Sequence, residues 1–249
     1  MTGTSRSEMR EAYGDDTDLE KRARIWRFAT NRRDIADVVV EHVGDAPVVL
    51  DVGCGNGRFL RKHRAVGLDL MAGMLDAARD TGCPLVQGAC EALPVRTASI
   101  DTAVAMHMLY HVPDLPAGVR ELRRVVRPGG TLVASTLGER NMTELDALVE
   151  ELAGIRNRSS LNFVLETAPD VLGATFDSVE VVRWQGELVV PEVVPVVDYI
   201  DSLRALVAPS LADRTWEDVV EEARRRITSE IESTGAWRAS TDVGILVCR

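Results

Sequence analysis

Three glycines at alternate positions follow a short apolar run that ends beside an acidic residue. The run Val48–Val52 contains Asp51, and Gly53, Gly55 and Gly57 come directly after it. Glycine permits positive φ and a close approach of backbone to a ligand. A dinucleotide fingerprint reads G-x-G-x-x-G, whereas this turn reads G-x-G-x-G. The acid disfavours a phosphate here and favours a ligand that carries an ammonium group.

A second acid ends the next apolar run, eighteen positions after the first. Asp69 follows Ala65–Leu68 in the sequence. An acid at the end of the second strand of such a unit can accept hydrogen bonds from both hydroxyls of an adenosine ribose. The alternative is a solvated acid at a strand end. We favour the ribose role because of the glycine turn upstream.

Two histidines and a tyrosine follow a later apolar run, at 100–105. They are His107, Tyr110 and His111. A histidine there could remove a proton from a hydroxyl or amine, and the alternative is a packed or capping side chain. The spacing of His107 and His111 also suits a pair of metal ligands on a helix. Because no third ligand suggests itself, we expect no metal site.

Strands and helices alternate around these residues. We expect strands at 48–52, 65–68, 84–87, 100–105 and 131–135, with helices at 57–63, 71–79 and 115–126. This alternation indicates a parallel sheet with helices on both faces. Right-handed crossovers then place the carboxyl ends of all these strands at one edge, which collects the glycine turn, both acids and the histidines.

The flanking regions are more helical. A polar arm to about residue 17 precedes helical residues 18–43, which Asn31 could interrupt. After residue 136 we expect helices at 142–155, 163–172, 193–207 and 215–233, with strands at 177–183 and 243–248. The fold class is therefore α/β, a Rossmann-like, seven-stranded, mostly parallel sheet whose final hairpin is antiparallel.

Composition limits the classes of function. The chain has 249 residues with 45% hydrophobic and 27% charged content, which is ordinary for a globular protein and excludes dominant disorder. Twenty-nine basic and 39 acidic residues give a net charge of −10, which argues against a nucleic acid or an anionic membrane as the main partner. The four cysteines show no metal-type spacing and read as reduced thiols, so we expect a cytoplasmic protein.

Five segments between Pro47 and Thr136 resemble the class I S-adenosylmethionine-dependent methyltransferases. The resemblance is to the small-molecule group that includes the ubiquinone and menaquinone biosynthesis enzymes. The segments, in order, are VLDVGCGNG, VGLDL, VQGACEALPV, SIDTAVAMHMLYHVPD and ELRRVVRPGGTLV. The resemblance implies that S-adenosylmethionine is the cofactor.

The resemblance also implies roles for single residues. Asp51, Gly53, Gly55 and Gly57 would hold the methionine part of the cofactor, and Asp69 its ribose. Leu70 and Met74 would pack near the adenine, and Met106 would complete the cofactor site. The family usually has an acid before a small residue after the third strand, whereas this chain has Ala89-Cys90. That departure removes one adenine hydrogen bond, which the backbone N–H of Cys90 could replace.

The sequence identifies the residues that contact the methyl acceptor less precisely than those that hold the cofactor. His107 and His111 are the candidate catalytic residues, and Tyr13, Tyr110 and Tyr199 are candidate contacts of the substrate. Met106 stands where N-methyltransferases of nucleobases and amides carry Asn or Asp, which argues against DNA or glutamine as acceptor. The arginines at 22, 24, 27, 32 and 33 could supply one guanidinium to the cofactor carboxylate and otherwise form a solvated face.

We expect one methyltransferase domain over residues 1–249. It comprises an N-terminal arm and helix (1–45), a cofactor-binding core (46–136) and a C-terminal part (137–249) with a helical cap at about 191–235. The expected activity is methylation of O, N or C on a small organic molecule, in a setting of specialised metabolism. Alternatives are an RNA methyltransferase, an NAD-linked oxidoreductase and a non-catalytic regulatory protein that binds S-adenosylmethionine. The sequence leaves the oligomeric state open.

Overall fold

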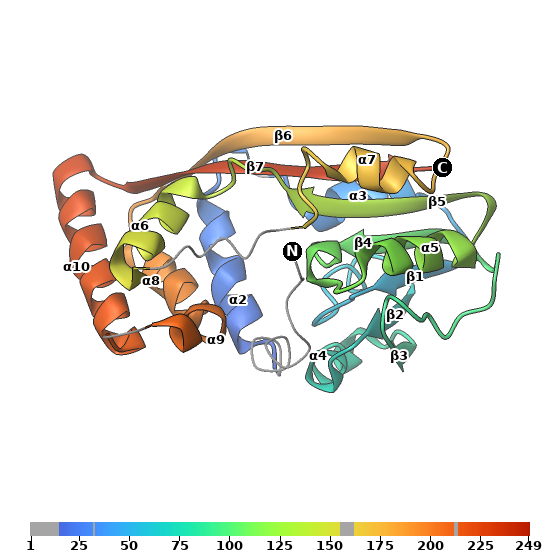
Figure 1. Ribbon diagram of the computed structural model, residues 1–249, viewed down its shortest axis with the longest axis horizontal. Helices are drawn as coiled ribbons and strands as arrows, with labels where there is room; N and C mark the ends of the chain where they lie inside the picture. Colours follow the sequence, from blue (N-terminus) through green and yellow to red (C-terminus); the bar gives the residue numbers. More distant parts are fainter. Residues whose placement is uncertain (1–14, 32, 155–161, 212–213) are drawn as a thin grey trace.

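The computed structural model describes residues 15–31, 33–154, 162–211 and 214–249. Its centre is a seven-stranded sheet in the order β3-β2-β1-β4-β5-β7-β6 (Figure 1). The strands are β1 (Val49–Val52), β2 (Val66–Asp69), β3 (Leu85–Gln87), β4 (Ile100–Met106), β5 (Val126–Leu137), β6 (Val179–Val190) and β7 (Trp237–Cys248). Strands β1 to β5 are parallel, and β7 runs antiparallel to both β5 and β6. The predicted α/β class and the antiparallel final hairpin are confirmed.

Helices cover both faces of the sheet. They are α2 (Thr17–Arg24), α3 (Ile35–Val43), α4 (Ala72–Ala77), α5 (Leu115–Val125), α6 (Thr143–Ala153), α7 (Ala168–Gly173), α8 (Val193–Asp201), α9 (Arg204–Val207) and α10 (Trp216–Thr234). Single 3₁₀ turns follow at Ile25–Phe28, Arg79–Thr81, Leu109–His111 and Ala208–Ser210. Side-chain caps begin several helices, since Asp34 accepts a hydrogen bond from the Ala36 N–H before α3 and Asp114 from the Ala117 N–H before α5. The predicted break in the N-terminal helical region is present between α2 and α3.

The predicted helix at 57–63 is wrong, because this stretch forms a series of turns. Only the Arg61 and His63 N–H groups donate four residues back, to the carbonyls of Gly57 and Phe59. Phe59 is fully buried in the core between the sheet and α3. Burial of this ring in a seven-residue connection outweighs the weak helical preference of so short a segment.

Several boundaries also differ from the expectations. Strand β5 begins at Val126, not 131, because residues 126–130 join the sheet through a register shift opposite β4. The helix expected at 163–172 begins only at Ala168. Strands β6 and β7 are each twelve residues long, and their paired ends extend past the rest of the sheet. Leu188 and Trp237 in these ends are buried against helices, which explains why the ribbon continues.

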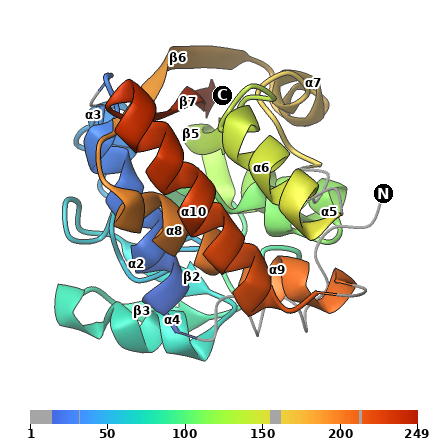
Figure 2. The same cartoon turned by 90° about the vertical axis from the view of Figure 1, so that its left-hand side faces the viewer.

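The helices beyond the carboxyl ends of β1, β4 and β5 form a second group, which we call the helical lobe (Figure 1). It consists of α2, α6, α8, α9 and α10 with the outer ends of β6 and β7, and Figure 2 views it with α10 in front. A buried cluster of its own includes Leu145, Ile200, Trp216 and Ile227. No helix in the described part of the chain is both long and apolar enough to cross a bilayer.

Two valines of α8 test whether the helical lobe contributes to the stability of the whole fold. Val196 is fully buried in the lobe's cluster, whereas Val194, two residues earlier, is 56% exposed. We expect Val196→Ala to lower the free energy of unfolding by about 2 kcal/mol, because two methyl groups and their contacts are lost. Val194→Ala should change it by less than about 0.5 kcal/mol. Urea unfolding followed by circular dichroism measures both, and equal effects would contradict this packing.

Candidate functional site

The glycine turn after β1 is fixed to the end of β2 by its backbone. The N–H groups of Gly53 and Cys54 both donate to the Leu68 carbonyl, at 2.7 and 3.0 Å. Gly53 has φ +69°, and a Cβ placed on it would lie 2.8 Å from the Cβ and Cγ of Met108. Only glycine fits this position, since it needs both the left-handed backbone and the missing side chain. The turn therefore packs directly under the loop that follows β4.

Asp51 is a buried carboxyl without a partner in the described chain. Its side chain belongs to a residue that is 1% exposed, and neither carboxyl oxygen has a hydrogen-bond partner among the described residues. Burial, followed by the nearby charge of Asp69, raises the pKa of Asp51 to about 8. A buried hydrogen-bond acceptor without a donor lowers the stability of the folded protein and marks a candidate ligand site. Its two oxygens suit an ammonium group.

Asp69 joins the glycine turn to the start of α4. Its Oδ2 accepts from the Gly55 N–H at 2.9 Å and its Oδ1 from the Met71 N–H at 2.8 Å. Burial raises the pKa of Asp69, and the backbone N–H groups of Met71, Gly55 and Leu70 oppose that rise. Each carboxylate oxygen keeps a further lone pair for a ligand hydroxyl.

The other predicted cofactor contacts surround this carboxylate. Leu70 follows it, and the Leu70 carbonyl accepts from the Nε2 of Gln87 at the end of β3, at 3.1 Å. Met74 on α4 is buried. The Cys90 side chain is buried and its thiol packs against α5, where a Cβ on Gly118 would lie 3.1 Å from its sulfur. These assignments, with that of Met106 at the end of β4, stay predictions.

The loop after β4 holds the histidines in a strained backbone. His107 has φ +50°, which is uncommon for a residue with a side chain. Its N–H donates to Ser135 on β5, to the Oγ at 3.0 Å and the carbonyl at 3.2 Å. The Tyr110 ring meets the His111 ring edge-on at 4.5 Å between centroids and lies 6.5 Å from that of His107. The three candidate side chains of this loop are therefore brought together.

Both imidazoles are neutral at physiological pH. Burial and then the guanidinium of Arg58 lower the pKa of His107 to about 4. Burial and then the guanidinium of Arg22, with a smaller effect of His107, lower the pKa of His111 to about 4. A base of this strength removes a proton poorly from a hydroxyl near neutral pH. The histidines are thus better suited to orient an acceptor than to deprotonate it.

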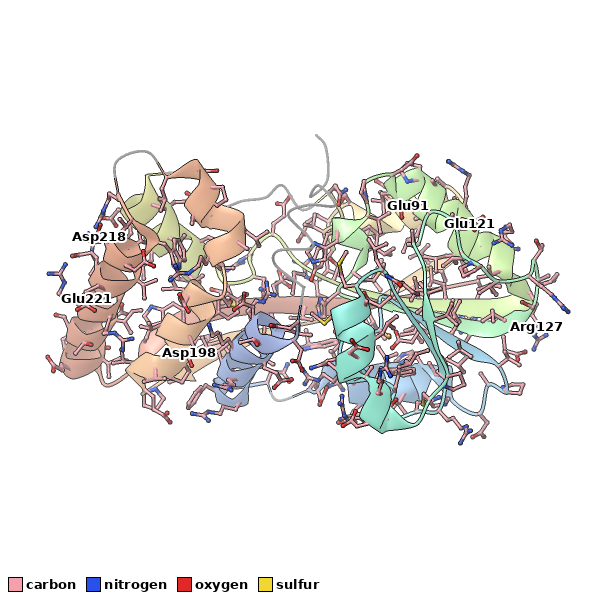
Figure 3. The ribbon with its side chains drawn as sticks, turned by 90° about the horizontal axis from the view of Figure 1, so that it is seen from below. Glu91, Glu121, Arg127, Asp198, Asp218 and Glu221 are labelled. Carbon is pink, nitrogen blue, oxygen red and sulfur yellow. The ribbon has the colours of Figure 1, made fainter. Side chains whose placement is uncertain are left out.

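Helix α2 lies between the glycine turn and α8 of the helical lobe. The Cδ2 of Leu19 is 3.6 Å from a Cβ placed on Gly55, and the Asn56 side chain donates to Glu20 Oε1 at 2.8 Å. On its other side, Lys21 Nζ lies 2.9 Å from Asp201 Oδ2 at the end of α8. Figure 3 shows α2 beside α8, on which Asp198 is labelled. This helix covers the turn that would hold the cofactor.

The predicted contacts of the substrate are only partly gathered at this edge. Tyr110 is there, whereas Tyr199 lies on α8 and packs against the cluster of the helical lobe. Tyr13 lies outside the described residues. Sequence reasoning did not identify Met108, Ser135 or Glu20, because their roles depend on contacts between distant segments. Within the described ranges, no group of three or more His, Cys, Asp or Glu could hold a metal ion.

Comparison with known proteins finds methyltransferases that are similar to this chain. The family described as "Methyltransferase domain" matches residues 50–134, which run from β1 to β5. A malonyl-[acyl-carrier protein] O-methyltransferase of Erwinia pyrifoliae is 36% identical over 160 residues, which cover 60% of this chain and 61% of that protein. A ubiquinone biosynthesis O-methyltransferase of Paracidovorax citrulli is 35% identical over 139 residues, covering 50% and 58%. The chain thus spans about 60% of the length of these relatives.

A solved structure shows the same fold over nearly the whole chain. It is a SAM-dependent methyltransferase of Thermotoga maritima, described as a possible histamine N-methyltransferase. The TM-score is 0.58 at 17% identity, and the match covers 96% of this chain and 99% of that one.

The raised pKa of Asp51 predicts a pH dependence of stability. An unfolded aspartate releases its proton near pH 3.8, whereas native Asp51 keeps it up to about pH 8. Between these values the native state binds more protons, so the Asp51 carboxyl makes the free energy of unfolding fall as pH rises. Asp51→Asn removes this dependence. Its stability relative to the unsubstituted protein should therefore rise by about 1.5 kcal/mol from pH 6.5 to pH 8.

Urea unfolding of the ligand-free protein at the two pH values measures this difference. The two histidines are present in both proteins, so their own pH dependence, which extends from their native pKa values near 4 to the unfolded value of 6.5, cancels in the difference. Asp76→Asn, at an exposed carboxylate of α4, is the control and should show no such change. A constant difference between Asp51→Asn and the unsubstituted protein would contradict the raised pKa.

Proposed function

We propose that this chain, whose residues 50–134 belong to the class I S-adenosylmethionine-dependent methyltransferases, transfers a methyl group to an oxygen atom of a small organic acceptor. The observation that carries the proposal is the buried carboxyl of Asp51 at the glycine turn, which has no hydrogen-bond partner among the described residues and lies one strand from Asp69. The two similar O-methyltransferases support oxygen as the acceptor atom. A setting in specialised metabolism belongs to the same proposal and depends on the identity of the acceptor.

The residues on the cofactor side bind and orient S-adenosylmethionine. Asp51 accepts the cofactor's ammonium group and ends the isolation of its own carboxyl in the core. The lone pairs that remain on Asp69 accept the two ribose hydroxyls, while its backbone bonds keep the turn in place. A dinucleotide would instead bring a pyrophosphate against Asp51, which that carboxyl opposes.

The acceptor side positions the methyl acceptor and keeps water away from the reacting atoms. S-Adenosylmethionine supplies an electrophilic methyl group on a sulfonium, so the reaction is an in-line displacement with a neutral thioether as leaving group. The neutral rings of His107, Tyr110 and His111 line the loop after β4 and can hold an acceptor beside that methyl group. Orientation and desolvation supply much of the rate in such a step. No residue of the site then has to act as a strong base.

Binding of S-adenosylhomocysteine tests the cofactor assignment. We expect Asp69→Ala to weaken binding by about 100-fold, because two hydrogen bonds to a charged group are lost at about 1.5 kcal/mol each. Asp69→Asn, which keeps one acceptor oxygen, should lose less, and Asp76→Ala should bind normally. Isothermal titration calorimetry gives the affinities. Unchanged affinity in Asp69→Ala, or displacement of the ligand by equimolar NADH, would overturn the assignment.

A further inference from the structure

The chain that leads into α7 crosses the carboxyl end of β5 (Figure 1). We call residues 162–167 the crossing segment. Thr136 Oγ1, at the end of β5, donates to the Phe163 carbonyl at 2.7 Å, and Phe163 is fully buried. The next strand residue, Leu137, accepts from the Leu165 N–H at 3.0 Å. The crossing segment is thus fixed to the edge of the sheet at which the candidate site lies.

The far end of the crossing segment is held by the side chain of Glu166. Its Oε1 lies 2.6 Å from the Arg183 guanidinium on β6, and its Oε2 accepts from the Glu139 N–H at 3.0 Å. Arg183 also pairs with Asp242 of β7, whose side chain is buried. Contacts with β5 and β6 therefore hold the segment in one place over the strand ends.

Asn162 begins the crossing segment and contacts the loop after β4. Its Nδ2 donates to the Val112 carbonyl at 3.4 Å. Val112 directly follows His111, whose ring meets that of Tyr110 edge-on at 4.5 Å between centroids. Tyr110 in turn packs against the buried cluster that contains Phe163. The Asn162 side chain is therefore placed on the acceptor side of the candidate site by direct contact.

The amide oxygen of Asn162 is a buried acceptor without a donor. Its Oδ1 is fully buried and has no hydrogen-bond partner among the described residues. Exchange of the amide oxygen and nitrogen would not supply one, because Oδ1 would then face the Val112 carbonyl oxygen. By contrast, Asn141 Oδ1 accepts from the Asp242 N–H at 3.0 Å. A fixed acceptor of this kind is suited to a hydrogen-bond donor on a ligand.

We propose that Asn162 is a specificity-determining residue of the acceptor side, whose Oδ1 receives a hydrogen bond from an uncharged O–H or N–H group of the methyl acceptor. This inference rests on the proposed function and specifies its substrate class. The amide takes up no proton, so Asn162 orients the acceptor and leaves the displacement at the methyl group unchanged.

Other polar groups fit this oxygen less well. A carboxylate has no donor at neutral pH and would bring its charge against the lone pairs of Oδ1. An ether has no donor either, so the buried oxygen would stay unpaired. An ammonium group could donate, but its charge would be buried against a single neutral acceptor. A site that hydrogen-bonds one substrate group rejects analogues that lack it, because its own polar atom is then left without a partner.

Two matched pairs of small molecules test the need for a donor. Benzyl alcohol is compared with benzyl methyl ether, and benzamide with benzoate, so that each pair shares a ring and differs in the donor. Each probe is titrated into the protein saturated with S-adenosylhomocysteine and followed by ligand-observed NMR. We expect the donor of at least one pair to bind at least about tenfold more tightly than its partner. The pair that shows the preference identifies the donor as a hydroxyl or an amide N–H.

Two asparagine substitutions assign the preference to one side chain. Asn162→Leu removes both polar atoms at a similar volume, and should reduce the preference to less than about threefold. It should leave the affinity for S-adenosylhomocysteine unchanged. Asn141→Leu is the matched control, because it removes an amide that bonds within the protein, and should retain the preference.

Thermal unfolding of the ligand-free variants, followed by circular dichroism, separates a binding role from a structural one. Asn162→Leu gives up a long hydrogen bond but also removes a buried acceptor without a donor, so its Tm should stay within about 2 °C of the unsubstituted protein. Asn141→Leu deprives the Asp242 N–H of its acceptor, and its Tm should fall by more than about 2 °C.

The inference is overturned if neither pair shows the preference, whether the probes bind equally, not at all or in the reverse order. It is also overturned by a preference that survives Asn162→Leu, or by a loss of Tm in Asn162→Leu as large as that in Asn141→Leu. A loss of S-adenosylhomocysteine affinity in Asn162→Leu would assign the amide to the cofactor instead. Failure of the unsubstituted protein to bind S-adenosylhomocysteine would overturn the proposed function itself, and this inference with it.

Discussion

The buried carboxyl of Asp51 constrains everything around it. Its strand is buried on both faces, and the N–H groups of Gly53 and Cys54 in the turn that follows it donate to the Leu68 carbonyl. The chain therefore places an acid where the described protein offers it no hydrogen bond, and Asp69 adds like charge nearby. Such an arrangement costs stability in the ligand-free protein. On the proposed function, the cofactor's ammonium group restores the missing interaction, so the cost of burying Asp51 becomes a source of affinity.

The second constraint is that the glycine turn is covered on two sides by segments far away in the sequence. Met108 approaches from the loop after β4, and Leu19 and Glu20 approach from α2. Because α2 also pairs with α8 through Lys21 and Asp201, the turn is linked to the rest of the helical lobe through one short helix. Movement of that helix would therefore change the cover of the glycine turn.

The features of the fold and the site that the sequence predicts are those that depend on the order of apolar and polar residues within short segments. The sequence predicts Asp51 and Asp69 at one sheet edge because Asp51 lies near the end of one apolar run and Asp69 ends the next, and parallel pairing brings such ends together. The pattern did not reveal the turns at 57–63, where the buried ring of Phe59 decided the conformation. Nor did it reveal the length of β6 and β7, which depends on packing against helices from other parts of the chain. The contacts of Glu20 with Asn56 and of Met108 with Gly53 join segments that no periodicity relates.

Recognition of the cofactor's ammonium group has to be local, because the overall charge of the protein does not select one cation over another. A net charge of −10 attracts any cationic ligand at long range. At physiological ionic strength such attraction between exposed charges is screened beyond about 8 Å. The buried Asp51 carboxyl acts at short range and in a lower dielectric, so on the proposed function it contributes more than the distant acids. The choice of an ammonium group is then set by one carboxyl at the glycine turn and not by the surface.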